Sequence, residues 1–305
     1  MANTFVNPTQ VVQTALALLR DDLILAATVN RDFEAEYGGG LGSTVNVRVP
    51  ATLKARRRQL GATTAVVTDN LAETTVPVKL TDMVYSAVPV TDEDLTLNIQ
   101  DFARQVLAPQ ITAIVEDLEN SVATTMLSLT ETTTLAYSAA NPIPTFTQAR
   151  KLLRDMGVPA AGLYAAVGTG VYAELLEAKA IVDASESGSS AALRDAVAGT
   201  VRGFQTLESN RLGDHDIVFY NRDSFTLAVR APIVPDGVAY GESRSEGGFA
   251  LRWIRDYDST VLADRSIVST LTGAQPMQLP RLNPDGTRTL VTPAIRVDTS
   301  TNPPA

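Results

Sequence analysis

Two short runs of alternating apolar and polar residues, separated by a long polar stretch, constrain the fold of this chain most strongly. Valines alternate with polar residues in 45–49, and Val76, Val78 and Leu80 do the same in the second run. A period of two indicates strands with one apolar face. We therefore expect a long antiparallel hairpin that projects from the rest of the protein.

The stretch between these runs is polar, rich in threonine, and carries the sharpest charge cluster of the chain. It contains Lys54 and the triplet Arg56, Arg57 and Arg58. An isolated two-stranded ribbon is marginally stable in water, so something outside the hairpin must cover it. We interpret Lys54 and the triplet as candidate contacts to a neighbouring subunit, with nucleic acid as the alternative partner for the triplet.

Composition excludes most common routes to catalysis. The chain has 305 residues, no cysteine and one histidine, His215. These counts exclude disulfides, thiolate nucleophiles, iron–sulfur clusters and metal sites that need two histidines from one chain. With 45% apolar and 19% charged residues the chain is typical of folded globular proteins. Its net charge of −9 disfavours a nucleic-acid-binding protein, because such proteins are usually basic.

Two segments predict long amphipathic helices. In residues 1–36, Asn7-Pro8 is typical of a helix start, and an apolar stripe follows at Val12, Leu16, Leu19 and Leu23. The glycine-rich segment 38–43 ends this helix and is interpreted as a hinge, since it matches neither phosphate-binding glycine motif. In residues 92–130, Asp92–Asp94 supply negative charge near a helix start, and Pro109 precedes an apolar face formed by Ile111, Ile114, Val115, Leu118, Val122 and Met126.

The rest of the chain mixes helices and strands in no regular order, which predicts an α+β fold. Thr145 and Gln148 resemble a capping box at the start of a helix. Strands are expected at Leu163–Val167, Gly199–Leu207, Asp216–Tyr220, Gly248–Tyr257 and Thr260–Leu271, and helices at Val171–Leu176 and Ala191–Val197. Residues 274–305 are rich in proline and read as an extended tail with a strand near Leu290–Val297.

No cluster of residues forms a strong catalytic motif. His215 lies between Asp214 and Asp216 just before a strand and is interpreted as a turn residue rather than a base. Asp256 and Asp258 share a strand face, but one carboxylate pair offers too few oxygens for calcium. We therefore predict no catalytic, cofactor-binding or metal-binding residue. A carboxylate-dependent hydrolase that uses Asp256 and Asp258 stays open as the enzymatic alternative.

No targeting or membrane segment is recognisable in the sequence. The first basic residue is Arg20, so no charged region precedes an apolar stretch as in a signal peptide. No apolar run approaches the ~20 residues of a membrane span. We expect a soluble protein that is made in a cytoplasm.

Three segments, taken in order, resemble the major capsid proteins of tailed bacteriophages with the Hong Kong 97 fold. Residues 42–50 (GSTVNVRVP) resemble the start of the extended loop of that family, residues 199–210 (GTVRGFQTLESN) a strand motif of its axial domain, and residues 248–258 (GFALRWIRDYD) a later strand. The resemblance covers most of residues 5–273 and implies an icosahedral shell of hexamers and pentamers that encloses double-stranded DNA. It also implies a virion location after assembly in the host cytoplasm, with a separate scaffolding protein, a portal and a decoration protein as partners.

The resemblance also implies a division of the chain. The expected parts are an N-terminal arm and helix (1–43), an extended loop hairpin with a peripheral-domain strand (44–90), a spine helix region (91–140), an axial domain (141–245), peripheral-domain strands (246–273) and an extended C-terminal tail (274–305). Some relatives form covalent crosslinks between lysine and asparagine. Lys54 lies in the extended loop, but no matching partner motif is recognisable, so no crosslink is expected.

Two further alternatives remain at the sequence level. A cellular encapsulating compartment shares the fold and would hold a cargo enzyme in place of DNA. A tail or adhesin-like binding protein would form trimers or fibres in place of isometric particles.

Overall fold

The computed structural model describes residues 8–31, 44–49, 53, 55–61, 63, 65–68, 74–91, 102–132, 135–178, 198–238, 240–246, 248–258, 263–283 and 288–300. Several sequence predictions fall outside these residues: Asn7, the glycine-rich segment 38–43, Lys54, Asp92–Asp94 and the helix at 191–197.

The described residues form a mixed set of helices and strands. The helices are α1 (Pro8–Asp22), α2 (Leu25–Thr28), α3 (Ala108–Leu127), α4 (Ile143–Asp155) and α5 (Thr169–Glu177), with a π-helical turn at Ala103–Leu107 and a 3-10 turn at Arg222–Ser224. The strands are β1 (Thr44–Val49), β2 (Thr74–Lys79), β3 (Asp82–Thr91), β4 (Leu163–Val167), β5 (Thr200–Val201), β6 (Phe204–Glu208), β7 (Asp216–Asn221), β8 (Phe225–Arg230), β9 (Tyr240–Glu246), β10 (Phe249–Asp258), β11 (Ala263–Pro276), β12 (Leu279–Leu282), β13 (Arg288–Val291) and β14 (Ala294–Asp298). The α+β prediction is confirmed.

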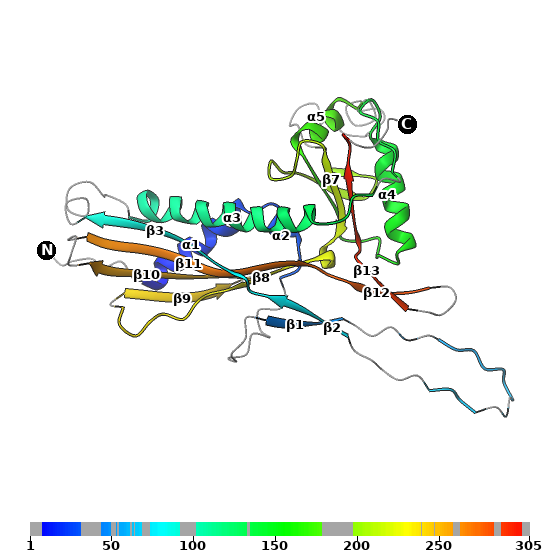
Figure 1. Cartoon of the computed structure of the whole chain (residues 1–305), viewed down its shortest axis with the longest axis horizontal. Coiled ribbons are helices and arrows are strands. Elements are labelled where there is room, and N and C mark those ends of the chain that lie inside the picture. Colours follow the sequence, from blue (N-terminus) through cyan, green and yellow to red (C-terminus); the bar gives the residue numbers. More distant parts are fainter. Residues whose placement is uncertain are drawn as a thin grey trace.

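The main sheet has the order β3-β11-β10-β9, with β8 paired to the far end of β11. Helices α1 and α3 lie on one face of this sheet (Figure 1). The predicted apolar faces of both helices are buried there in one hydrophobic cluster, which confirms the two stripes. The helix predicted after Pro109 therefore begins at Ala108 and runs along the sheet for 20 residues.

Two buried polar side chains tie α3 to its neighbours. Gln110 donates from Nε2 to the backbone oxygens of Ser86 on β3 and Ser266 on β11, at 3.0 and 2.8 Å. Glu119 lies further along the helix and accepts three backbone N–H groups from Ile24 to Ala26, each at 2.9 Å. Because the start of α2 has no side-chain cap of its own, the Glu119 carboxylate takes that role from another helix.

A second sheet has the order β14-β7-β4-β6-β5 and carries α4 and α5. One face of this sheet packs with the two helices around a cluster of aromatic rings, Phe146, Phe204 and Phe219. The opposite face joins the core of the main sheet through Val218 and Tyr220 of β7. The second sheet is therefore shared by both hydrophobic clusters.

Two local predictions were wrong. Residues 199–207 form two short strands, β5 and β6, because Arg202 (φ 49°) and Gly203 (φ 87°) adopt left-handed backbone and turn the chain. Helix α4 begins at Ile143, and Thr145 does not cap it, because its hydroxyl donates to the backbone oxygen of Ala136 at 2.9 Å.

The segment after residue 274 contributes to both sheets. β11 continues to Pro276, β12 pairs with β13, and β14 pairs antiparallel with β7 along its whole length. Ile295 and Val297 of β14 are buried in the second cluster. Among the residues that the structure describes, no helix is long and apolar enough to cross a membrane.

Candidate intersubunit surface

The predicted hairpin is confirmed in its paired strands. β1 and β2 pair antiparallel, with Val45 opposite Val78 and Val47 opposite Val76. The described residues between them (53, 55–61, 63 and 65–68), here called the hairpin loop, are all exposed. Figure 1 shows this loop extending away from both sheets.

The hairpin loop exposes apolar side chains as well as charge. Leu53, Leu60, Val66 and Val67 are exposed to 54%, 101%, 71% and 62%. Burying such side chains stabilises a complex by roughly 25 cal/mol for each Å² of apolar surface. Among the described residues of the subunit, none buries these four side chains. Four exposed apolar side chains on one projecting hairpin make the hairpin loop a candidate interaction surface.

The structure places Arg56, Arg57 and Arg58 together on this exposed loop. Residues 44–80 hold six basic and two acidic residues, a net charge of +4, so the rest of the chain carries −13. The basic hairpin and the acidic remainder are therefore electrostatically complementary between copies of the same chain.

The base of the hairpin packs against β8 and the end of β11 in the main sheet. Val78 is buried in a small cluster with Ala228 and Met277. The backbone N–H of Thr81 donates to Thr272 at 3.1 Å. Beside it, β11 passes so close that a Cβ on Gly273 would lie 1.9 Å from the backbone oxygen of Lys79. The base is therefore a close backbone crossing at which glycine is required.

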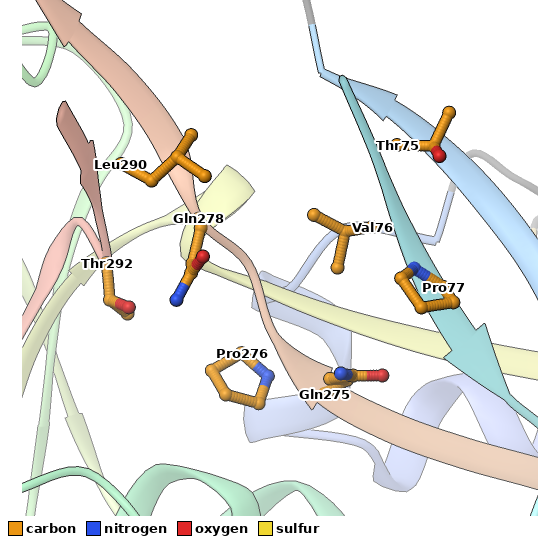
Figure 2. Close-up of a pocket in the computed structure, with 8 residues that line it drawn as sticks. All are labelled: Thr75, Val76, Pro77, Gln275, Pro276, Gln278, Leu290 and Thr292. Carbon is orange, nitrogen blue, oxygen red and sulfur yellow. The ribbon is translucent and has the colours of Figure 1, made fainter. Parts of the chain in front are cut away.

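A pocket of about 350 Å³ lies next to this crossing (Figure 2). It opens between β2, the end of β11 and the β12–β13 hairpin, and Leu290 on its wall is 49% exposed. Its lining residues are Thr75, Val76, Pro77, Gln275, Pro276, Gln278, Leu290 and Thr292. Sequence reasoning missed this pocket, because it depends on segments about 200 residues apart meeting in space.

An open groove of about 600 Å³ runs between β3 and α3. Two carboxylates line it, Asp82 on the strand and Asp117 on the helix. Met83 and Tyr85 also line it and are exposed to 47% and 66%. The groove joins negative charge with exposed apolar area, which complements the composition of the hairpin loop.

The residues weighed for chemistry do not form a catalytic site. Asp256 is held in an ion pair by Arg265 on the adjacent strand, and the hydrogen bond to Asp256 raises the pKa of Arg265. His215 is exposed, while its neighbour Asp214 accepts from Thr169 and its other neighbour Asp216 accepts from Arg296. Among the described residues, no group of three metal-ligating side chains comes together.

Comparison with known proteins agrees with a shell subunit. The family model described as "P22 coat protein - gene protein 5" matches residues 1–214. No curated protein matches the chain. Among solved structures, one of Mycobacterium phage Che8 is 18% identical with a TM-score of 0.62, and the match covers 92% of each chain.

Two more solved structures share the fold. The mature capsid of bacteriophage PhiM1 is 15% identical with a TM-score of 0.55, over 86% of this chain and 83% of that one. A virus-like particle from Pyrococcus furiosus is 12% identical with a TM-score of 0.51, over 94% of this chain and 98% of that one. At these identities the likeness is one of fold.

Proposed function

This chain belongs to the P22 coat protein family, and from that premise we propose how its copies meet in a shell. It is a major capsid protein of a tailed bacteriophage, a structural and non-enzymatic subunit of the virion that assembles with copies of itself into an icosahedral shell. Its copies form hexamers and pentamers, and the shell encloses the double-stranded DNA genome. In each ring the hairpin loop lies on the neighbouring copy, where Lys54, Arg56, Arg57 and Arg58 contact acidic surface.

The exposure of the hairpin loop supports this arrangement most directly. The apolar side chains of its described residues are exposed in the subunit. Its net positive charge is complemented by the net negative charge of the rest of an identical chain. Many modest contacts repeated around a shell give a stable assembly without any single strong contact. A loop that is uncovered in the free subunit gains its buried area only on assembly.

The divisions expected from the sequence fit this proposal. The second sheet with α4 and α5 makes up the axial domain at the centre of each ring, α3 is the spine helix, and the main sheet carries the peripheral strands. The axial domain expected at 141–245 also takes in β14 from the segment expected as a tail, whereas β8 and β9 pair in the main sheet. Assembly takes place in the host cytoplasm, guided by a separate scaffolding protein, around a portal, and with a decoration protein on the finished shell.

Electron microscopy of the expressed chain with a scaffolding protein tests the proposal. We expect closed isometric particles, and a chain that stays monomeric at high concentration with scaffold present would contradict it. Particles that hold genomic DNA identify a virion shell, whereas particles that hold an enzyme identify a cellular compartment.

Charge reversal tests the role of the hairpin loop. The triple variant R56E/R57E/R58E should abolish particles while the unassembled subunit keeps its circular dichroism spectrum. The double variant Q59A/T63A is the matched control, because it alters two exposed neutral side chains of the same loop. Normal particles from the triple variant would show that the arginines do not contact a neighbour.

A further inference from the structure

Arg296 lies where the second sheet meets the end of α3. It is on β14, between Ile295 and Val297, whose side chains are buried in the second hydrophobic cluster. Successive side chains of a strand point to opposite faces, so Arg296 faces away from that cluster. Its contacts lie on β7 and at the last turn of α3.

The guanidinium of Arg296 holds two elements at once. Its Nε donates to Oδ1 of Asp216 on β7 at 2.9 Å, and a terminal nitrogen donates to the backbone oxygen of Leu127 at 2.8 Å. The Arg296 and Asp216 side chains are 23% and 12% exposed. The backbone oxygen of Arg296 also accepts the N–H of Thr132, just after the helix, at 2.8 Å.

This pairing suits the chemistry of both partners. The oxygen of Leu127 is one of the last carbonyls of α3, which have no partner within the helix and carry the negative end of its dipole. A planar guanidinium has donors that point in fixed, different directions and can reach Asp216 and Leu127 together. A lysine ammonium concentrates its charge on one nitrogen at the end of a flexible chain, so it lacks the fixed, divergent donors that reach Asp216 and Leu127 together.

Arg296 completes a two-point attachment of β7. At the end of the strand, the ring of Tyr220 packs edge-to-face with Phe225 of β8, and its hydroxyl forms a hydrogen bond with the hydroxyl of Thr28 on α2. At the start of the strand, Asp216 is joined to α3 through Arg296. A strand of six residues spans about 17 Å, so these two attachments fix its direction where one would leave a pivot.

We propose that Arg296 is a positioning residue that sets the angle between the second sheet and α3, and through that angle the curvature of the assembled shell. The inference rests on the proposed function. Head-to-tail rings close only when each copy has the correct rotation to the next, and otherwise such contacts propagate as open assemblies. A small error in the shape of the subunit therefore repeats at every contact and changes the particle.

The variants R296A and R296K, with R265A as the control, test this role. R265A also removes an arginine from an ion pair, but that pair joins β10 and β11 within the main sheet and does not link the two sheets. Each chain is assembled with scaffold, and particle diameters are measured by electron microscopy and sedimentation. Circular dichroism and thermal melting of the unassembled subunits report folding separately.

Wild-type and R265A chains should give particles of one diameter. R296A and R296K should fold and give mixed diameters or open sheets, with R296K failing to rescue because it loses the contact with Leu127. Wild-type diameters from both Arg296 variants would overturn the proposal. Failure of both variants to fold would also overturn it, since Arg296 would then be needed for folding and not for positioning. Failure of the wild-type chain to form particles would instead contradict the proposed function.

Discussion

Helix α1 and the hairpin loop both carry apolar side chains, but only α1 finds cover within its own subunit. Leu16 and Leu19 of α1 are each 1% exposed, whereas Leu60 of the hairpin loop is 101% exposed. The difference lies in which elements pack against each segment. The stripe of α1 meets α3 and the main sheet, while the hairpin loop extends away from the other described helices and strands.

This contrast separates two uses of apolar surface in one subunit. Burying a leucine side chain stabilises the folded subunit by about 1.5–3 kcal/mol, so α1 contributes to folding. The exposed leucines and valines of the hairpin loop contribute nothing of this kind while they remain exposed. The amphipathic stripe therefore serves the stability of the subunit, whereas we propose that the hairpin loop serves assembly.

Removing the Glu119 carboxylate should have the largest effect on the subunit. Glu119→Ala leaves three backbone N–H groups next to α2 without their acceptor, and we expect a loss of about 3–5 kcal/mol in the free energy of unfolding. Urea denaturation of the unassembled subunit measures it. Glu116→Ala is the control, because Glu116 is 55% exposed and pairs with Arg211 at the surface. Equal losses from both variants would show that α1 and α2 are not anchored through Glu119.

Replacing one leucine of α1 and one leucine of the hairpin loop with alanine tests the comparison of these two segments directly. Leu16→Ala should lower the free energy of unfolding by about 3 kcal/mol, because it removes a buried side chain and leaves a cavity. Leu60→Ala should leave the same quantity nearly unchanged, and should reduce the yield of particles instead. If Leu60→Ala destabilised the unassembled subunit as much as Leu16→Ala, the loop would have cover within its own chain.

A methyl group at the hairpin base should have an intermediate effect. Gly273→Ala places its Cβ 1.9 Å from the backbone oxygen of Lys79, so the strands must separate at a cost of about 1–3 kcal/mol. Thermal melting and limited proteolysis of the hairpin loop would report the change. Gly237→Ala is the matched control, since no atom lies within 4 Å of its added Cβ. Identical behaviour of the two variants would mean that the hairpin base tolerates movement.

Reversing one charge on the hairpin loop should have the smallest effect on the subunit. Arg57→Glu alters an exposed side chain, and we expect the free energy of unfolding to stay within about 0.5 kcal/mol of wild type. Denaturation curves of the two subunits should therefore overlap. A clear shift would place Arg57 among the contacts that hold the subunit together.

The sequence predicted those elements whose apolar pattern extends over many residues or whose strand partner is near in the chain. The stripes of α1 and α3 and the alternation in β1 and β2 identified these elements, because burial on one face fixes the spacing of apolar residues. Exposure of the arginine triplet on a projecting hairpin was also foreseen. The need for outside cover on the hairpin was predicted as well, but the segments that cover α1 were not, because they lie far along the chain.

Other features were hidden by their context. Glu119 is one of three acidic residues on α3 and looks like a surface residue, yet it lies four residues after Val115 and three before Val122, on the buried side. β14 follows a proline-rich stretch, and its partner β7 is about eighty positions earlier in the chain. Pairing over such distances leaves only a short alternation, at Ile295 and Val297, as a local signal.

The place of β14 has a consequence for the timing of synthesis. A ribosome makes the chain from its N-terminus, so β14 is the last of the described elements to emerge, after the helices and every strand that it joins. Until β14 is made, one edge of β7 lacks its strand partner. The backbone oxygen of Leu127 likewise lacks the hydrogen bond that Arg296 donates to it. A nascent subunit therefore completes the second sheet only after all its other described elements have been made.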